Sequence, residues 1–354
     1  MKLKFAPLAT ALLFLHLSCR KAETSEQTQT NIPEVLTEFS YKVAYATYSD
    51  LEQKANQLHS KIMSFNSTNT SIDLEACKQL WKDTRAAWEQ SEAFLFGPVA
   101  TEDIDPAIDD WPVNQQDLDS LLASNQVFSQ GFLDSTQTTL KGFHPMEYLL
   151  FGANGSKTPG DFTVREHEYL VALADYIKRL TTKLRKTWEP TEPGNYLVQF
   201  TQAGSNGNIY ASKRAAVEEL VNAMIGICEE VADGKIQEPL AAQDPKLEES
   251  QFSKNSITDF KNNIISVQNA YNGNYTENGI GLNNWVNQNN ISLDNKVQQK
   301  IVNAINAFDL ITIPFGEAII SQQNQLATVQ QALRDLKAVL EDELLPFVQQ
   351  TITE

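Results

Sequence analysis

Hydrophobic residues recur at intervals of three and four over long stretches of this sequence, and strict alternation over the length of a strand is hard to find. Such spacing is typical of a helix with one buried face. The clearest windows are residues 72–96, 163–188, 212–234 and 326–347. The pattern therefore predicts an all-α fold in which each window is an element of a helical bundle.

Segments rich in Gly, Pro, Asn and Asp separate these windows and are loops by composition. The longest departure from helical periodicity is EPTEPGNYLVQFTQAGSNGN, residues 189–208. A chain of 354 residues also suggests two domains rather than one. We therefore expect two four-helix-bundle-like domains, residues 32–205 and 206–354.

The N-terminus has the pattern of a bacterial export signal. Lys2 and Lys4 precede an apolar run over residues 8–17, which is too short to span a bilayer, and Cys19 follows a small residue. This pattern predicts a lipoprotein anchored to the membrane through Cys19 and located in the cell envelope. Because His16 occupies a position where a lipobox usually has an aliphatic residue, simple secretion is the alternative. The predicted bounds are 1–18 for the signal peptide and 19–31 for the lipidated tether.

The formal net charge of the chain is -17, which argues against nucleic acid as a partner because an acidic surface repels phosphate backbones. The same charge serves solubility or attracts cations. Besides Cys19 the chain has Cys77 and Cys228, each on an apolar helical face. We expect two separately buried thiols, although a disulfide between them is possible in an oxidising compartment.

The segment KGFHPMEYLLFG contains the residues that most suggest chemistry. His144 and Glu147 lie three residues apart, and helical bundles present two ligands to one metal in this way. Pro145 also fits the first position of a helix, in which case His144 would be the N-cap and Glu147 could reach back to its amide as in a capping box. On spacing alone, a ligand pair and a helix cap are equally well supported.

Two further segments could complete a site. Arg85, Trp88 and Glu92 recur at helical spacing, and the loop IDDWPVN supplies Asp109 beside Trp111. Several enzyme signatures are absent, among them HExxH, GxSxG, a Walker loop and paired CxxC. The usual geometry of a zinc protease is therefore not available.

Taken in order, the segments WKDTRAAWEQSEAFLFGP, IDDWP and GFHPMEYLLFG resemble the imelysin family, whose hallmark Gly-x-His-x-x-Glu corresponds here to Gly142, His144 and Glu147. A downstream segment with the acidic and serine patch Glu249, Ser250 and Ser253 is also similar. The resemblance implies a pair of four-helix bundles, an envelope location, an association with iron-uptake systems and a historical assignment as a metallopeptidase.

Three hypotheses about function follow from the residues and the resemblance together. The first is an envelope lipoprotein that binds iron or another divalent cation, with His144, Glu147 and Glu92 as ligands; its site would be lined by Arg85, Trp88, Asp109, Trp111 and Gly142. The second is a metallopeptidase in which the same pair holds zinc. The third is a module without a metal that binds a peptide or a glycan between its bundles.

Overall fold

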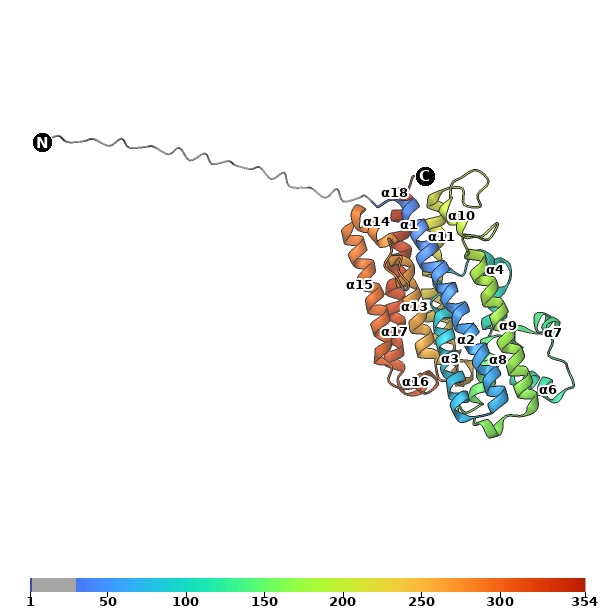
Figure 1. The fold of residues 1–354 in the computed structure, drawn as a ribbon. Coiled ribbons are helices and arrows are strands. Elements are labelled where there is room, and N and C mark those ends of the chain that lie inside the picture. The colour runs from blue at the N-terminus through green and yellow to red at the C-terminus, as the bar shows by residue number, and fades with distance from the viewer. Residues whose placement is uncertain (2–29, 354) are drawn as a thin grey trace.

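The computed structural model describes Met1 and residues 30–353, and this part of the chain contains helices and no β-strand. The long helices lie side by side in one elongated body (Figure 1). The prediction of an all-α fold is confirmed. The α-helices are α1 (Ile32–Glu38), α2 (Ala46–Thr68), α3 (Ser71–Glu89), α4 (Pro98–Thr101), α5 (Ile104–Asp109), α6 (Gln115–Ala123), α7 (Gln130–Ser135), α8 (Phe143–Phe151), α9 (Val164–Trp188), α10 (Leu197–Thr201), α11 (Lys213–Glu229), α12 (Gln237–Ala242), α13 (Ser256–Asn272), α14 (Leu282–Asn289), α15 (Ile291–Ala307), α16 (Phe315–Ser321), α17 (Gln323–Val339) and α18 (Leu345–Thr351).

Shorter helical segments connect or extend these helices. Three of them are π-helical and continue a longer helix, and the others are 3₁₀ turns. The π-helical segments are η1 (Phe39–Tyr45), η5 (Glu230–Ile236) and η8 (Leu340–Leu344), and the 3₁₀ turns are η2 (Glu92–Phe94), η3 (Thr138–Leu140), η4 (Pro159–Asp161), η6 (Pro245–Leu247) and η7 (Phe308–Leu310).

In the first half of the chain, α2 packs against α3 and α9, and the short helix α8 packs against the same two neighbours. Helix α9 confirms the window 163–188. Its N-cap Thr163 accepts a hydrogen bond from the amide of Glu166, whose carboxylate accepts one from the amide of Thr163 in return. This capping box fixes where the helix begins.

The predicted helix over residues 72–96 ends earlier than its hydrophobic pattern does. Helix α3 stops at Glu89, and η2 follows after a break. The cause is local, because both the amide and the hydroxyl of Ser91 donate to the carbonyl of Trp88. That carbonyl is thereby taken from the amide of Glu92, which would otherwise continue the helix.

In the second half, α11, α13, α15 and α17 form a closed ring of contacts, each packing against the next. Their buried faces carry the hydrophobic residues of the sequence windows, Leu220 and Leu333 among them. The window 212–234 corresponds to α11 and its extension η5, and the last window to α17, η8 and α18. The division into two independent domains stays a prediction.

The two halves meet where α3 and η2 contact α11 and α13. The amide of Ala93 donates to the hydroxyl of Ser266 at 2.9 Å, and Gln90 donates to the side chain of Asn262 at 2.7 Å. This junction is polar as well as hydrophobic, and the candidate site lies in it.

No single helix among residues 30–353 is long and apolar enough to cross a membrane. One pair of helical segments is long and apolar enough only when its members are taken together, namely Ile291–Leu310 with Phe315–Ser321. The chain bends by 84° between these two segments. Cys19 and the predicted signal segment after Met1 lie outside the described residues.

Cys77 and Cys228 are both buried and free, so the prediction of two separate thiols is confirmed. His167 is half-buried, with its ring 5.2 Å from that of Phe65 and 4.9 Å from that of Phe162, measured between centroids. It therefore has a packing role in α9.

Candidate metal centre

Helix α3 brings three functional side chains into the junction. The inner face of the helix carries Arg85, Trp88 and Glu89, which lie within about one turn of one another. All three are fully buried. The guanidinium of Arg85 lies 2.5 Å from the carboxylate of Glu89, one turn further along. Asn263, on α13, donates a hydrogen bond to Glu89 from the other half of the chain.

Asp109 is the last residue of α5 and is only 4% exposed. Its Oδ1 accepts a hydrogen bond from Nη1 of Arg85, and its Oδ2 accepts one from the indole nitrogen of Trp88 at 2.5 Å. The next residue, Asp110, is extended, so the chain turns away directly after the carboxylate. Two residues of α3 therefore hold this aspartate in place.

Helix α8 carries the Gly-x-His-x-x-Glu motif and begins one residue after Gly142, which is its N-cap with φ of 86°. His144 is thus the second residue of the helix. The alternative in which His144 is the N-cap and Glu147 closes a capping box is wrong. Pro145 is tolerated as the third residue because the first amides of a helix have no partner within it.

The carboxylate of Glu147 faces the second half of the chain. Its Oε1 accepts hydrogen bonds from the amide of Phe252 at 3.1 Å, the amide of Ser253 at 2.7 Å and the hydroxyl of Ser253 at 2.6 Å. The other oxygen lies 3.4 Å from Nδ1 of His144. Glu147 therefore connects the imidazole to the loop before α13.

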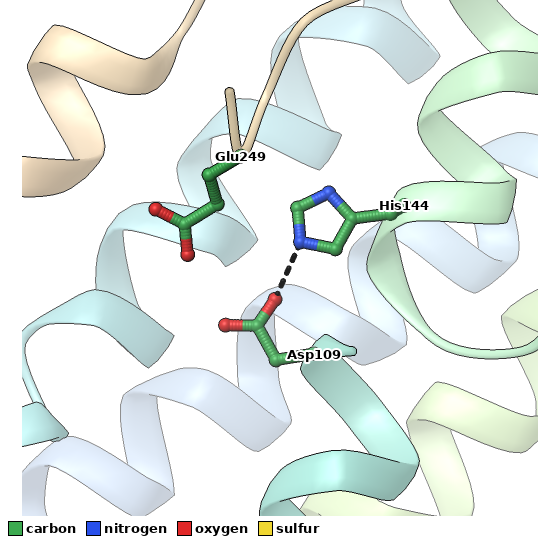
Figure 2. A group of neighbouring side chains, drawn as sticks. All are labelled: Asp109, His144 and Glu249. Carbon is green, nitrogen blue, oxygen red and sulfur yellow. Dashed lines mark ion pairs between the residues drawn. The ribbon is translucent and has the colours of Figure 1, made fainter. Parts of the chain in front are cut away.

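The opposite nitrogen of this imidazole points toward two further carboxylates. Nε2 of His144 lies 3.0 Å from Oδ1 of Asp109. Together with Glu249, these two residues offer three ligand atoms that all lie within 4.8 Å of one another. Figure 2 shows the three side chains converging from different segments of the chain. Oε2 of Glu249 has no hydrogen-bond partner, and Nε2 of His144 makes no well-angled hydrogen bond beyond its short contact with Asp109. We refer to Asp109, His144 and Glu249 as the triad.

Two buried cations accompany these carboxylates. Nη2 of Arg85 lies 2.7 Å from Oε1 of Glu249, and Nζ of Lys235, on η5, lies 3.1 Å from the same oxygen. Lys235 also reaches outward, because its ammonium lies 3.7 Å from the exposed Glu230 and 5.2 Å from the ring centre of Trp111.

Carboxyl groups outnumber cationic side chains in this part of the junction. We name the whole set the charged cluster; it consists of Arg85, Glu89, Glu92, Asp109, His144, Glu147, Lys235, Glu249 and Asp259. All members are buried, so their charges interact through protein rather than water. Such an excess of carboxyl groups favours the binding of a cation when the groups are ionised.

Burial sets the protonation of the triad. It lowers the pKa of His144 well below the usual value, and Arg85 and Lys235 lower this pKa further, so the imidazole is neutral and can bind a cation. Burial acts to raise the pKa of Glu249, but Lys235 and Arg85 outweigh it and hold this pKa below its usual value. Glu249 is therefore an ionised carboxylate.

Other members of the cluster hold their protons more tightly. Burial raises the pKa of Glu147 to about 8 against the opposing effect of hydrogen bonds from Ser253. Burial likewise raises the pKa of Glu89 to about 8, although Arg85 lowers it. The pKa of Glu92 is also raised, first by burial. These groups can give up protons when another cation supplies positive charge.

The structure brings together most of the residues that the sequence singled out. Trp111 is half-buried with its ring centre 6.2 Å from that of His144. Glu92 lies elsewhere in the cluster, because its ligand atoms group with those of Glu89 and Asp109 and not with His144. Asp109, expected to line the site, stands beside the imidazole itself.

Sequence reasoning missed four members of the cluster as candidates for chemistry, namely Glu89, Lys235, Glu249 and Asp259. The signal for Glu249 was present, since it belongs to the acidic and serine patch of the segment that resembles the imelysin family. Glu89 lies one turn from Arg85 on the same predicted helix and could have been found from that spacing. Lys235 follows the end of the predicted helix 212–234, and nothing in its surroundings distinguishes it from a surface lysine.

The triad fits a transition-metal cation. It offers one imidazole nitrogen and two carboxylates, and Oε2 of Glu249 lacks a hydrogen-bond partner although it is buried. Glu147 contacts the second ring nitrogen, and metal-binding histidines commonly donate to such a group. Asp109, His144 and Glu249 are the residues that would hold the ion, and Glu147 would orient the imidazole.

A family model described as Imelysin matches residues 44–341. The chain belongs to the imelysin family. Among curated proteins, iron-regulated protein A of Synechococcus elongatus is 29% identical over 317 residues, which cover 88% of this chain and 85% of that protein. The resemblance seen in the sequence is therefore confirmed.

Two crystal structures share the fold. One is described as an iron-regulated protein A precursor from Parabacteroides distasonis and matches with a TM-score of 0.82 and 26% identity, covering 93% of this chain and 97% of that chain. The other is an imelysin-like protein from Psychrobacter arcticum with a TM-score of 0.73 and 13% identity, covering 90% of this chain and 95% of that chain.

Proposed function

We propose that this imelysin-family protein binds an iron ion, reversibly, at Asp109, His144 and Glu249. The observation that carries the proposal is the buried, neutral imidazole of His144, whose Nε2 lies 3.0 Å from Oδ1 of Asp109 and within 4.8 Å of a carboxylate oxygen of Glu249. A neutral imidazole with two carboxylates is a ligand set suited to iron, manganese or zinc, and it contains no soft sulfur ligand.

The names of two relatives support iron over the other metals. Both the protein from Synechococcus elongatus and the structure from Parabacteroides distasonis are described as iron-regulated protein A, and they cover most of this chain. We propose that this chain serves iron uptake and is attached to the cell envelope through a lipid on Cys19.

Burial of the triad favours an ion over a polypeptide as the bound species. Asp109, His144 and Glu249 are 4%, 1% and 2% exposed, and the residues around them pack closely. A peptidase must bring a peptide bond within contact of its metal and its general base. An ion is far smaller than a polypeptide and needs contact only with the ligand atoms themselves.

Calorimetric titration of the mature protein with Fe²⁺ under anaerobic conditions tests the proposal, with Mn²⁺ and Zn²⁺ titrated in parallel. We expect one Fe²⁺ per chain bound to the triad. His144→Ala removes the only nitrogen ligand of the triad and should abolish this binding. His59→Ala is the matched control, because His59 lies in α2 outside the charged cluster.

The outcomes separate the hypotheses. Absence of binding by all three ions, or binding that His144→Ala leaves unchanged, would overturn the proposed site. Tight binding of Zn²⁺ together with cleavage of an unfolded polypeptide that a chelator stops would favour the peptidase instead. Iron binding without cleavage supports the proposal.

A further inference from the structure

Arg85 occupies the position of a cation that competes with a metal ion. Its side chain is fully buried, and it contacts both carboxylates of the triad. Nη1 donates to Oδ1 of Asp109, and Nη2 lies 2.7 Å from Oε1 of Glu249. The oxygen of Asp109 that Arg85 holds is also the one that lies 3.0 Å from Nε2 of His144.

A metal ion bound to the triad would therefore share its oxygens with a guanidinium. Two positive charges at such separations repel strongly in a buried site, where water does not screen them. The conflict is direct at Asp109, where Arg85 contacts Oδ1, the oxygen that faces the imidazole. At Glu249 the guanidinium contacts Oε1 and draws on the same negative charge, although Oε2 stays without a hydrogen-bond partner.

A second carboxylate outside the triad lies close to the guanidinium. Nε of Arg85 has no hydrogen-bond partner, and neither has Oδ2 of Asp259, on α13. These two side chains approach to 3.9 Å, measured from Nε of Arg85 to Oδ1 of Asp259. Glu89, at 2.5 Å from Nη2, lies outside the triad as well. A short movement of Arg85 would thus exchange Asp109 for Asp259 while keeping Glu89.

We propose that Arg85 is a movable internal counter-ion that competes with the bound metal for Asp109 and Glu249 and passes to Asp259 when the metal binds. The inference rests on the proposed metal site and specifies how that site is regulated. Arg85 weakens metal binding, and by doing so it makes the ion a cargo that is released rather than a cofactor that is retained. Asp259 strengthens metal binding, because it pairs with the guanidinium of Arg85 after the guanidinium has left the triad.

The test measures dissociation constants for Mn²⁺, which is stable to oxidation, by titration followed with electron paramagnetic resonance. Arg85→Met keeps the length of the side chain and removes its charge, so we expect binding about tenfold tighter or more. Asp259→Asn keeps the shape of the receiving side chain and removes its charge, so we expect binding about tenfold weaker. Arg214→Met, at an exposed arginine paired with Glu218, controls for the loss of one positive charge.

The opposite signs of the two effects distinguish competition from a structural role. Damage to the fold would weaken binding in both variants, and a positioning role for Arg85 would make Arg85→Met bind more weakly than the parent protein. Either result overturns the inference, and so does unchanged binding in Asp259→Asn. If Arg85→Met does not fold, Arg85→Gln, which also removes the charge but keeps a polar end, takes its place, and tighter binding is again the expected result. Absence of Mn²⁺ and Fe²⁺ binding by the parent protein would instead overturn the proposed function.

Discussion

Replacement of Gly142 by alanine tests how the Gly-x-His-x-x-Glu motif is built into the fold. Gly142 has φ of 86°, where a residue with a side chain is strained by about 1–2 kcal/mol. An added Cβ would also lie 2.2 Å from the carbonyl oxygen of Ile108 and 2.6 Å from its carbon. One of the two backbones must move by roughly 1 Å to reach an ordinary contact.

The size of the effect follows from these two contributions. Overpacking of a close-packed interior costs about 1–3 kcal/mol, so Gly142→Ala should lose roughly 2–5 kcal/mol of unfolding free energy. Ile108 immediately precedes Asp109, and a displacement there moves a proposed ligand. We therefore also expect binding of Fe²⁺ or Mn²⁺ to weaken on the order of tenfold.

Urea titration followed by circular dichroism measures the stability, and two other glycines separate the contributions. Gly194 has φ of 73° with no neighbouring atom within 4 Å of an added Cβ, so Gly194→Ala should show only the backbone strain. Gly131, within α7, has neither a positive φ nor a close neighbour, so Gly131→Ala should not destabilise. The reasoning fails if Gly142→Ala is no less stable than Gly194→Ala.

Three further predictions concern protonation, the ligands and the thiols. Because the folded protein keeps protons on Glu147 and Glu89, whose pKa values rise from 4.5 to about 8, each of these groups should lower the unfolding free energy of the metal-free protein by about 1.4 kcal/mol per pH unit between roughly pH 5.5 and 7. Urea titrations should show a flatter dependence in Glu147→Gln, and a stability that rises over this range would contradict the assignment. Glu249→Gln should abolish Fe²⁺ binding in calorimetry, whereas retained binding would remove Glu249 from the ligand set. Cys77 and Cys228 should react with a thiol reagent only after unfolding, and rapid labelling of the folded protein would show that their burial is incomplete.

The fold was largely predictable because helical periodicity is a local property. The window 163–188 matches α9 closely, since Thr163 and Glu166 form a capping box that can be recognised in the sequence. The early end of α3 was not predictable from hydrophobicity. It depends on Ser91, whose hydroxyl takes a carbonyl that the helix would otherwise use.

The site was predictable only in part because it is assembled from distant segments. The motif residues His144 and Glu147 lie on one short helix, and their spacing pointed to chemistry. Which groups meet them depends on how the two halves pack. Glu249 comes from a loop more than a hundred residues later, and the ligand atoms of Glu92, expected as a ligand, group with those of Glu89 and Asp109. The acidic and serine patch marked the segment of Glu249, but no pattern along the chain says which carboxylate meets the imidazole.

The charged cluster lies where the two halves of the chain meet, and this position has a thermodynamic consequence. Asp109 and His144 belong to the first half and Glu249 to the second, so an ion that binds all three also joins the halves. Binding of the ion then stabilises the contact between the halves by some coupling free energy. Linkage requires that separation of the halves weakens ion binding by the same free energy. A protein that binds the outer surface of either half, and shifts it slightly, would control release of the ion without contacting a single ligand.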